Sequence, residues 1–199
     1  MAVWYPTIVP PATMLVFMLG CLAFFASVLV QRIKGVRAKA AGGKRDLVSL
    51  LGIAVQALGI AFASGQARIV GDGWLDGLMS RRTCAVVVLL AASVALFRWA
   101  AAAMGRNWAI VASLRADHQL VVDGPFAYVR NPIYVAMGLF LVSLALATAH
   151  ERALAVALPV FLLGTSIRIW REERLLRGMF GAEYDAYAAR VKRLIPFIV

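Results

Sequence analysis

The sequence predicts an all-α integral membrane protein with five transmembrane helices and a cytoplasmic C-terminal amphipathic helix. Of its 199 residues 62% are hydrophobic, and the mean hydropathy is +0.81, whereas soluble domains are about 45–50% apolar. The net charge of +11 comes from short basic clusters between apolar runs, the distribution found beside membrane helices. A nucleic-acid-binding protein would spread its positive charge over one polar face, so we expect no nucleic-acid partner.

Five apolar runs predict the spans, because each approaches the roughly 20 residues that cross a bilayer as a helix. They lie near residues 12–30, 47–64, 83–104, 132–149 and 153–170. The second run is the weakest, since it contains Gln56 and Ser64 and is rich in glycine. A tight turn at residues 149–152 makes the last two runs an antiparallel hairpin. Such a hairpin brings the start of the fourth run beside the end of the fifth.

The basic residues predict the orientation in the membrane. With the N-terminus outside, the inward-facing segments contain fifteen of the 21 lysines and arginines, and the outward-facing segments contain four. The positive-inside rule then places the C-terminus in the cytoplasm. Residues 1–11 lack a charged side chain, so we expect no cleaved signal peptide.

The segment 123–134 holds two prolines, two tyrosines, a glycine and an arginine. Gly124-Pro125 predicts a turn, since glycine adopts unusual backbone angles and proline fixes its own. Asn131-Pro132 predicts a helix start, with Asn as the N-cap and Pro at the first helical position. Such an entrance presents backbone N–H groups and Arg130 to an anionic group. The alternative is an ordinary loop whose Arg and Tyr side chains anchor the protein at the membrane interface.

Two adjacent carboxylates, Glu172 and Glu173, form the second half of the candidate site. On a helix they point about 100° apart, so only one aims squarely at a given pocket. In one interpretation they are solvated residues that pair with Arg168 and Arg177 at i,i+4 spacing. In the other, one carboxylate accepts hydrogen bonds from the vicinal hydroxyls of a ribose, as acidic residues do in dinucleotide-binding folds.

An amphipathic helix is predicted after the glutamates, because Phe180, Tyr184, Tyr187 and Val191 fall on one helical face. We expect this helix to lie on the membrane, with its aromatic residues toward the bilayer and its charges toward water. The aromatic face is also compatible with capping a cofactor that carries a cationic sulfonium.

Both blocks match the signature of a known family. Residues Leu120 to Tyr134 resemble the pattern L-V-x-x-G-P-Y-x-x-x-R-H-P-x-Y of isoprenylcysteine carboxyl methyltransferases and their bacterial relatives. The phospholipid methyltransferases have a similar C-terminal half. The rest of the signature resembles Glu172-Glu173-Arg174-x-Leu176, Phe180-Gly181-x-Glu183-Tyr184-x-x-Tyr187 and Arg193-Leu194-Ile195-Pro196. The resemblance covers residues 105–199.

The resemblance implies an S-adenosylmethionine-dependent membrane methyltransferase with an all-helical fold, in a bacterial-type inner or plasma membrane. Residues 1–104 would form three spans with a basic cytoplasmic loop, and residues 105–199 would form the catalytic region of loop, hairpin and C-terminal helices. The cofactor would lie at the cytoplasmic mouth of the hairpin, and a lipophilic acceptor would enter from the bilayer. The positions that would bind the cofactor are Leu120, Val121, Gly124, Pro125, Tyr128, Arg130, Asn131, Pro132, Tyr134, Glu172 and Glu173.

Two positions depart from the family pattern. Asn131 stands where the signature usually has His, and Phe126 stands where it usually has Tyr. Asn131 can still donate a hydrogen bond and cap the helix, so cofactor binding is compatible with the change. A role that requires an imidazole ring is not compatible with this change.

Methyl transfer from a sulfonium mainly requires alignment of donor and acceptor and exclusion of water. A carboxylate or thiolate acceptor arrives ionised and needs only a cationic clamp, for which Arg168 and Arg174 are candidates. An amine acceptor needs a base, for which Glu173 is the nearest candidate. The sequence has no obvious dedicated base, which favours an anionic acceptor over an amine. The resemblance suggests an isoprenylcysteine-type carboxylate, so O-methylation is favoured, and a lipid, small thiol or amine is the alternative acceptor.

Other functional classes stay open at this point. One is a non-catalytic membrane subunit that keeps the fold without binding cofactor. Another is a small transporter, which would need ionisable groups within its spans, and only Arg98 lies well inside one. The histidines are isolated in sequence, so no metal site is predicted. The oligomeric state is open, although Gly52 and Gly59 define a helix face that allows close packing.

Overall fold

The computed structural model describes residues 8–36, 47–65, 68–69, 77–105 and 119–195, and these form a helical bundle. The predicted basic loop after the first span and the segment before Gln119 lie mostly outside the described residues. The helices are α1 (Pro11–Val36), α2 (Leu47–Ala63), α4 (Arg81–Met104), α5 (Pro132–Ala147), α6 (Leu154–Phe180) and α7 (Ala182–Arg190), with 3-10 turns η2 (Gly124–Ala127) and η3 (Glu151–Ala153).

A short parallel pairing of β1 (Ile8–Val9) with β2 (Arg68–Ile69) was not anticipated from the sequence. Two residues are too few to show the alternating pattern by which a strand is recognised. Apart from this pairing and an isolated bridge near α5, the described residues confirm the predicted all-α class.

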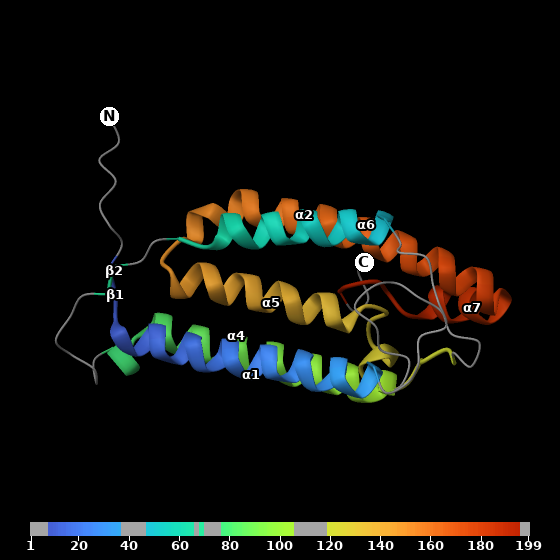
Figure 1. Ribbon diagram of the computed structural model, residues 1–199, viewed down its shortest axis with the longest axis horizontal. Helices are drawn as coiled ribbons and strands as arrows, with labels where there is room; N and C mark the ends of the chain where they lie inside the picture. The colour runs from blue at the N-terminus through green and yellow to red at the C-terminus, as the bar shows by residue number, and fades with distance from the viewer. Residues whose placement is uncertain (1–7, 37–46, 66–67, 70–76, 106–118, 196–199) are drawn as a thin grey trace.

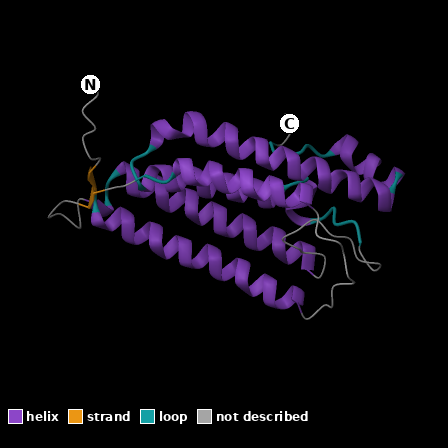
Figure 2. Ribbon diagram, turned by 45° about the horizontal axis from the view of Figure 1, so that its top comes forward, coloured by secondary structure: helices purple, strands orange, loops and turns teal. Residues whose placement is uncertain are grey.

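The five long helices run alternately in opposite directions along the bundle (Figure 1). As a result, α1, α4 and α6 end, and α2 and α5 begin, at one end of the molecule, which we call the site end. Figure 2 shows the same helices side by side, with the short strands at the opposite end. Segments that are far apart in sequence therefore meet at the site end.

Among the described residues, three helical segments are long and apolar enough to cross a membrane: Pro11–Ile33, Arg81–Met104 and Glu151–Phe180. Helices α2 and α5 are shorter, with 17 and 16 residues. A helix of that length rises about 25 Å, which is less than the roughly 30 Å of a hydrocarbon core. The prediction of five transmembrane helices is thus confirmed, by length and composition, for three of them.

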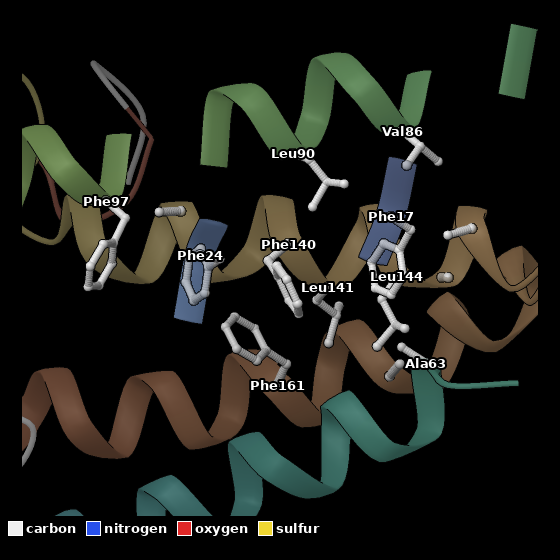
Figure 3. Close-up of a cluster of buried hydrophobic side chains, with 14 of the residues drawn as sticks. Phe17, Phe24, Ala63, Val86, Leu90, Phe97, Phe140, Leu141, Leu144 and Phe161 are labelled. Carbon is white, nitrogen blue, oxygen red and sulfur yellow. The ribbon is translucent and has the colours of Figure 1, made fainter. Parts of the chain in front are cut away.

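Helix α5 lies at the centre of the bundle, and each of its residues is buried or half-buried. Phe140 of α5 contacts Phe17 and Phe24 of α1, with ring centroids 5.9 and 4.9 Å apart. Phe161 of α6 lies on another side of this cluster (Figure 3). Because protein surrounds α5, this short helix does not have to match the thickness of the bilayer by itself.

Helix α2 packs mainly along α6, and glycines allow the close approach. A Cβ atom on Gly59 would lie 2.7 Å from the backbone nitrogen of Phe161, and a Cβ on Gly164 would lie 2.6 Å from that of Gln56. Gly52 also faces α6, since its Cβ would lie 3.0 Å from the Gly164 carbonyl oxygen. The face formed by Gly52 and Gly59 is therefore buried within the chain and is not a surface for oligomerisation.

The predicted hairpin of the last two spans is present as a connection but not as the main packing contact. The chain reverses between α5 and α6, where the His150 N–H donates to the Ala145 carbonyl at 2.7 Å. Helix α5 nevertheless packs mainly along α4, and the Ser93 hydroxyl of α4 donates to the Ala136 carbonyl at 2.7 Å. Chain neighbours are thus less closely packed here than α2 and α6, which small residues bring together.

We predict that Gly59→Ala destabilises the protein, because the added methyl group has to displace the backbone of α6. The expected loss is about 1–3 kcal/mol, the usual penalty for overpacking. Gly178→Ala is the matched control, since a Cβ on Gly178 meets nothing within 4 Å. Thermal unfolding in detergent measures both variants. Equal midpoints for Gly59→Ala and Gly178→Ala would contradict the proposed close packing.

Candidate functional site

The predicted turn at Gly124-Pro125 is present. Gly124 has a φ of 63°, a left-handed conformation that favours glycine. A Cβ on Gly124 would lie 3.2 Å from Nε1 of Trp99, so glycine also lets the turn pack on the end of α4. Tyr128 follows at the surface, 62% exposed, with its ring centroid 6.2 Å from that of Trp99.

Helix α5 begins at Pro132, with Asn131 at the N-cap position, as predicted. The expected capping hydrogen bond is absent, because the Asn131 side chain accepts no bond from the first turn. Its Nδ2 instead donates to the carbonyl oxygen of Arg193 at 3.2 Å. Asn131 therefore connects the start of α5 to the C-terminal segment.

We call this C-terminal segment, residues 181–195, the tail. It pairs with the residues before α5 through a parallel bridge between Val129 and Lys192. The Arg130 N–H donates to the Lys192 carbonyl at 2.7 Å. The Arg130 side chain adds two bonds, from one terminal nitrogen to the carbonyls of Ala188 at 2.6 Å and Val191 at 2.8 Å. Arg130 thus holds the tail with its main chain and with its side chain.

Glu173 is the centre of an ion-pair cluster. Its side chain is only 4% exposed. Oε1 accepts from Arg130 and Arg193, and Oε2 accepts from Arg193, each at 2.9 Å. Arg177 lies 3.6 Å from Oε2. A buried carboxylate is stable only when it is paired. These four residues, the Glu173 cluster, therefore hold α6, the start of α5 and the tail together.

Glu172 belongs to a second polar cluster, together with Tyr134, Arg168 and Gln56. Its Oε1 accepts from the Tyr134 hydroxyl at 2.5 Å and lies 3.6 Å from the Arg168 guanidinium. Arg168 also stacks on the Tyr134 ring, 5.1 Å from the centroid, and donates to Oε1 of Gln56 at 3.3 Å. The Glu172 side chain is 29% exposed. It is therefore more accessible than that of Glu173.

Both predicted i,i+4 pairs are present, Glu172 with Arg168 and Glu173 with Arg177. The interpretation that the two glutamates are simply solvated is wrong for Glu173, because three arginine side chains and the tail cover its carboxylate. The hydrogen bonds that Arg193 donates to the Glu173 carboxylate raise the pKa of Arg193 above its ordinary value, so this cation stays charged throughout the physiological range.

The aromatic face of α7 packs on protein. Tyr184 and Tyr187 are 1% and 5% exposed, and the Tyr187 hydroxyl donates to the Phe126 carbonyl at 2.8 Å. Burial raises the pKa of Tyr184 to about 12 and also raises that of Tyr187, so both hydroxyls stay protonated. The expectation that this face lies on the membrane is wrong for these two side chains, since the turn before α5 covers Tyr187 and Arg177 lies over Tyr184.

The structure brings five predicted site residues into the two clusters: Arg130, Tyr134, Arg168, Glu172 and Glu173. The other predicted residues are not members of these clusters. Leu120 and Val121 are half-buried, Gly124, Pro125 and Tyr128 belong to the turn on α4, and Pro132 is buried at the start of α5. Arg174 is exposed and lies over the Trp170 ring at 5.6 Å. Its predicted role as a clamp stays a prediction.

Three residues of the clusters were not predicted as site residues. Arg177 was expected only as the i,i+4 partner of Glu173. Arg193 carried a signal, since it belongs to the resemblance, but its partner could not be identified from spacing. Gln56 was noticed only as a polar residue that weakens the second span. It is 2% exposed, and a buried carboxamide in an apolar helix indicates a specific hydrogen-bond partner.

The chain is similar to known proteins over part of its length. A protein from Schizosaccharomyces pombe named protein-S-isoprenylcysteine O-methyltransferase is 37% identical over 90 residues, which are 45% of this chain and 38% of that protein. A nickel-cobalt-cadmium resistance protein, NccN, from Alcaligenes xylosoxydans is 33% identical over 96 residues, or 48% of this chain and 45% of that protein. The chain thus matches less than half the length of either relative.

The family model for phospholipid methyltransferases matches residues 81–183, which is more than half of the chain. The match begins in α4, before the predicted boundary at residue 105, and takes in η2, α5, α6 and the start of α7. It therefore covers both glutamates and the helix entrance that they face. The chain belongs to the phospholipid methyltransferase family, a family of membrane methyltransferases.

Proposed function

We propose that this protein is an integral membrane methyltransferase that uses S-adenosylmethionine and acts on a lipophilic acceptor. One observation carries the proposal: the carboxylates near the end of α6 lie against Arg130 and Tyr134 at the start of α5. The family match supports methyl transfer. The long apolar helices support a membrane location, and the basic segments favour a site end in the cytoplasm.

The residues at the site end fit the chemical groups of S-adenosylmethionine, which carries a carboxylate, an ammonium, ribose hydroxyls and a cationic sulfonium. Within the described part of the chain, the buried Nε of Arg130 has no hydrogen-bond partner, so it can donate to an anionic group. The partly exposed carboxylate of Glu172 can accept from hydroxyls or an ammonium. The exposed ring of Tyr128 suits a cation.

The two glutamates have different roles in this proposal. Glu172 contacts the cofactor, because its side chain is accessible and Tyr134 orients it. Glu173 acts indirectly, since its carboxylate is already bound by three arginine side chains. By holding Arg130 and Arg193, Glu173 keeps the tail closed over the start of α5.

When bound, the cofactor supplies an electrophilic methyl group on its sulfonium. The chain has to bind the cofactor, align it with the acceptor and exclude water. Arg130 and Glu172 bind the cofactor from two sides, and the tail covers the start of α5. No proton transfer is needed if the acceptor is already an anion.

An anionic acceptor is favoured by the contacts of Glu173. An amine acceptor would need a base, and a carboxylate held by several guanidinium groups is a weak one. Arg168, in contrast, is a cation 3.6 Å from Glu172 and can bind a carboxylate. A prenylcysteine carboxylate, the acceptor class named for the Schizosaccharomyces pombe relative, has both the anion and the apolar chain.

The acceptor is tested by incubating the purified protein in lipid nanodiscs with a lipid extract and a radiolabelled methyl donor. Alkali releases the label as methanol from a methyl ester but not from a methylated amine. We expect base-labile label, and mass spectrometry of the product then identifies the acceptor. Label that resists alkali would contradict a carboxylate acceptor and indicate methyl transfer to an amine or thiol.

We predict that the protein binds S-adenosylhomocysteine and that Arg130→Ala weakens this binding at least about tenfold, the effect of losing a charged hydrogen bond. Arg82→Ala is the matched control. Arg82 also bonds a backbone carbonyl and pairs with Glu151 at 2.8 Å, but it lies at the end of the bundle opposite the site. Isothermal titration calorimetry measures both variants. Absence of binding to the wild-type protein would favour a non-catalytic subunit.

We predict that Glu172→Gln and Glu173→Gln fail in different ways. Glu173→Gln leaves the buried Arg130 and the more exposed Arg177 and Arg193 without their carboxylate, at a cost of about 3 kcal/mol, and frees the tail. Glu172→Gln weakens S-adenosylhomocysteine binding while the tail stays protected. Hydrogen exchange of residues 182–195, measured beside calorimetry, separates the two results. Equal tail protection in both variants would argue against the role assigned to Glu173.

A further inference from the structure

Gln56 lies on α2, outside the residues that the family model matches. We propose that it is a positioning residue, which holds the Arg168 guanidinium where the anionic group of the acceptor binds. This inference rests on the proposed function, and in particular on Arg168 as the cationic clamp. It assigns part of the site to α2, a helix that carries none of the family signature.

The chemistry of the contacts fixes the orientation of Gln56. Arg168 only donates hydrogen bonds, so the atom of Gln56 that it contacts at 3.3 Å must be the carbonyl oxygen. The amide nitrogen then points to Thr165, and donates to its hydroxyl oxygen at 2.8 Å. Thr165 is fully buried and Gln56 nearly so. Each polar group of the Gln56 side chain therefore has a defined partner on α6.

Two glycines make room for this contact. A Cβ on Gly52 would lie 2.5 Å from Cγ of Arg168, and a Cβ on Gly164 would lie 2.9 Å from Cγ of Gln56. The aliphatic part of the Arg168 side chain thus passes over Gly52, one helical turn before Gln56 on α2. A larger residue at either glycine would push Arg168 and Gln56 apart.

Arg168 is held from two sides. Gln56 contacts it from α2, and Tyr134 contacts it from α5, through the ring at 5.1 Å. Its charge is directed to Glu172, 3.6 Å away at the partly exposed edge of the cluster. The Gln56 carbonyl supplies an acceptor for the buried guanidinium, and the Thr165 hydroxyl holds Gln56 in turn. Together these contacts keep a flexible side chain in one place.

A merely structural Gln56 and a positioning Gln56 predict different kinetics. Loss of a structural hydrogen bond lowers stability without selecting between the two substrates. Loss of a positioning contact frees the clamp and raises the KM for the anionic acceptor, while cofactor affinity is kept. The second pattern is the one we expect, because Arg130 and Glu172 contact the cofactor in our proposal and Gln56 contacts neither.

The test compares Gln56→Met with the wild-type protein in nanodiscs. Methionine has a similar length and volume but lacks the carboxamide. We expect the KM for S-farnesylcysteine to rise about tenfold, as for loss of a hydrogen bond to a charged group, with an unchanged Kd for S-adenosylhomocysteine. Ser93→Ala is the control, since it removes a buried hydrogen bond between α4 and α5 and should leave both constants unchanged. Thr165→Val, which removes the second partner of Gln56, should raise the KM in the same direction if Gln56→Met does not fold, and Thr165→Ser should restore it.

The outcomes separate this inference from the proposed function. Suppose that the wild-type protein binds S-adenosylhomocysteine and methylates S-farnesylcysteine. If Gln56→Met and Thr165→Val then leave the KM for S-farnesylcysteine unchanged, or alter this KM and the Kd for S-adenosylhomocysteine equally, Gln56 is only structural. If the wild-type protein binds S-adenosylhomocysteine but methylates phosphatidylethanolamine in vesicles and not S-farnesylcysteine, the assignment of Arg168 to an anionic acceptor is overturned. A wild-type protein that binds no S-adenosylhomocysteine overturns the proposed function and this inference together.

Discussion

The carboxylate of Glu173 is the group on which the site end depends. A charge with 4% of its side chain exposed requires opposite charges around it, and the chain supplies them from distant positions. Arg130 comes from the loop before α5, Arg177 from the next turn of α6, and Arg193 from the tail. Because one buried anion requires these partners together, the loop, the helix end and the tail have to adopt one arrangement.

This requirement explains why two neighbouring glutamates do different things. Glu173 faces Arg130 and the tail, whereas Glu172, about 100° further round the helix, faces Tyr134 and Arg168. The first is buried and saturated with donors, so it stabilises the arrangement. The second is partly exposed and bound by a tyrosine and an arginine, so it can contact a ligand. In the proposed function, the helix thus separates a structural carboxylate from a ligand-binding one by a single residue.

The other contribution comes from the contact between α2 and α6. Small residues let these helices approach closely, which is a common way of packing helices in a membrane, where lipid competes with apolar side chains. Close approach places the carboxamide of Gln56 within reach of Arg168. The packing of α2 against α6 and the geometry of the polar cluster of Glu172, Tyr134, Arg168 and Gln56 therefore depend on each other. Of these two helices, only α6 contains the family signature.

The sequence by itself determined the membrane class, the approximate ranges of the helices, the turn at Gly124, the start of α5 at Pro132 and the two blocks that meet at the site end. These features follow from composition, helical periodicity and the backbone preferences of glycine and proline, all of which are local. Only the tertiary structure decided that α6 packs on α2, that Asn131 bonds the tail instead of capping its helix, that α7 buries its tyrosines, and which glutamate is covered. Those outcomes depend on contacts between residues such as Arg130 and Glu173 or Gln56 and Arg168, and no spacing along the chain specifies such long-range pairs.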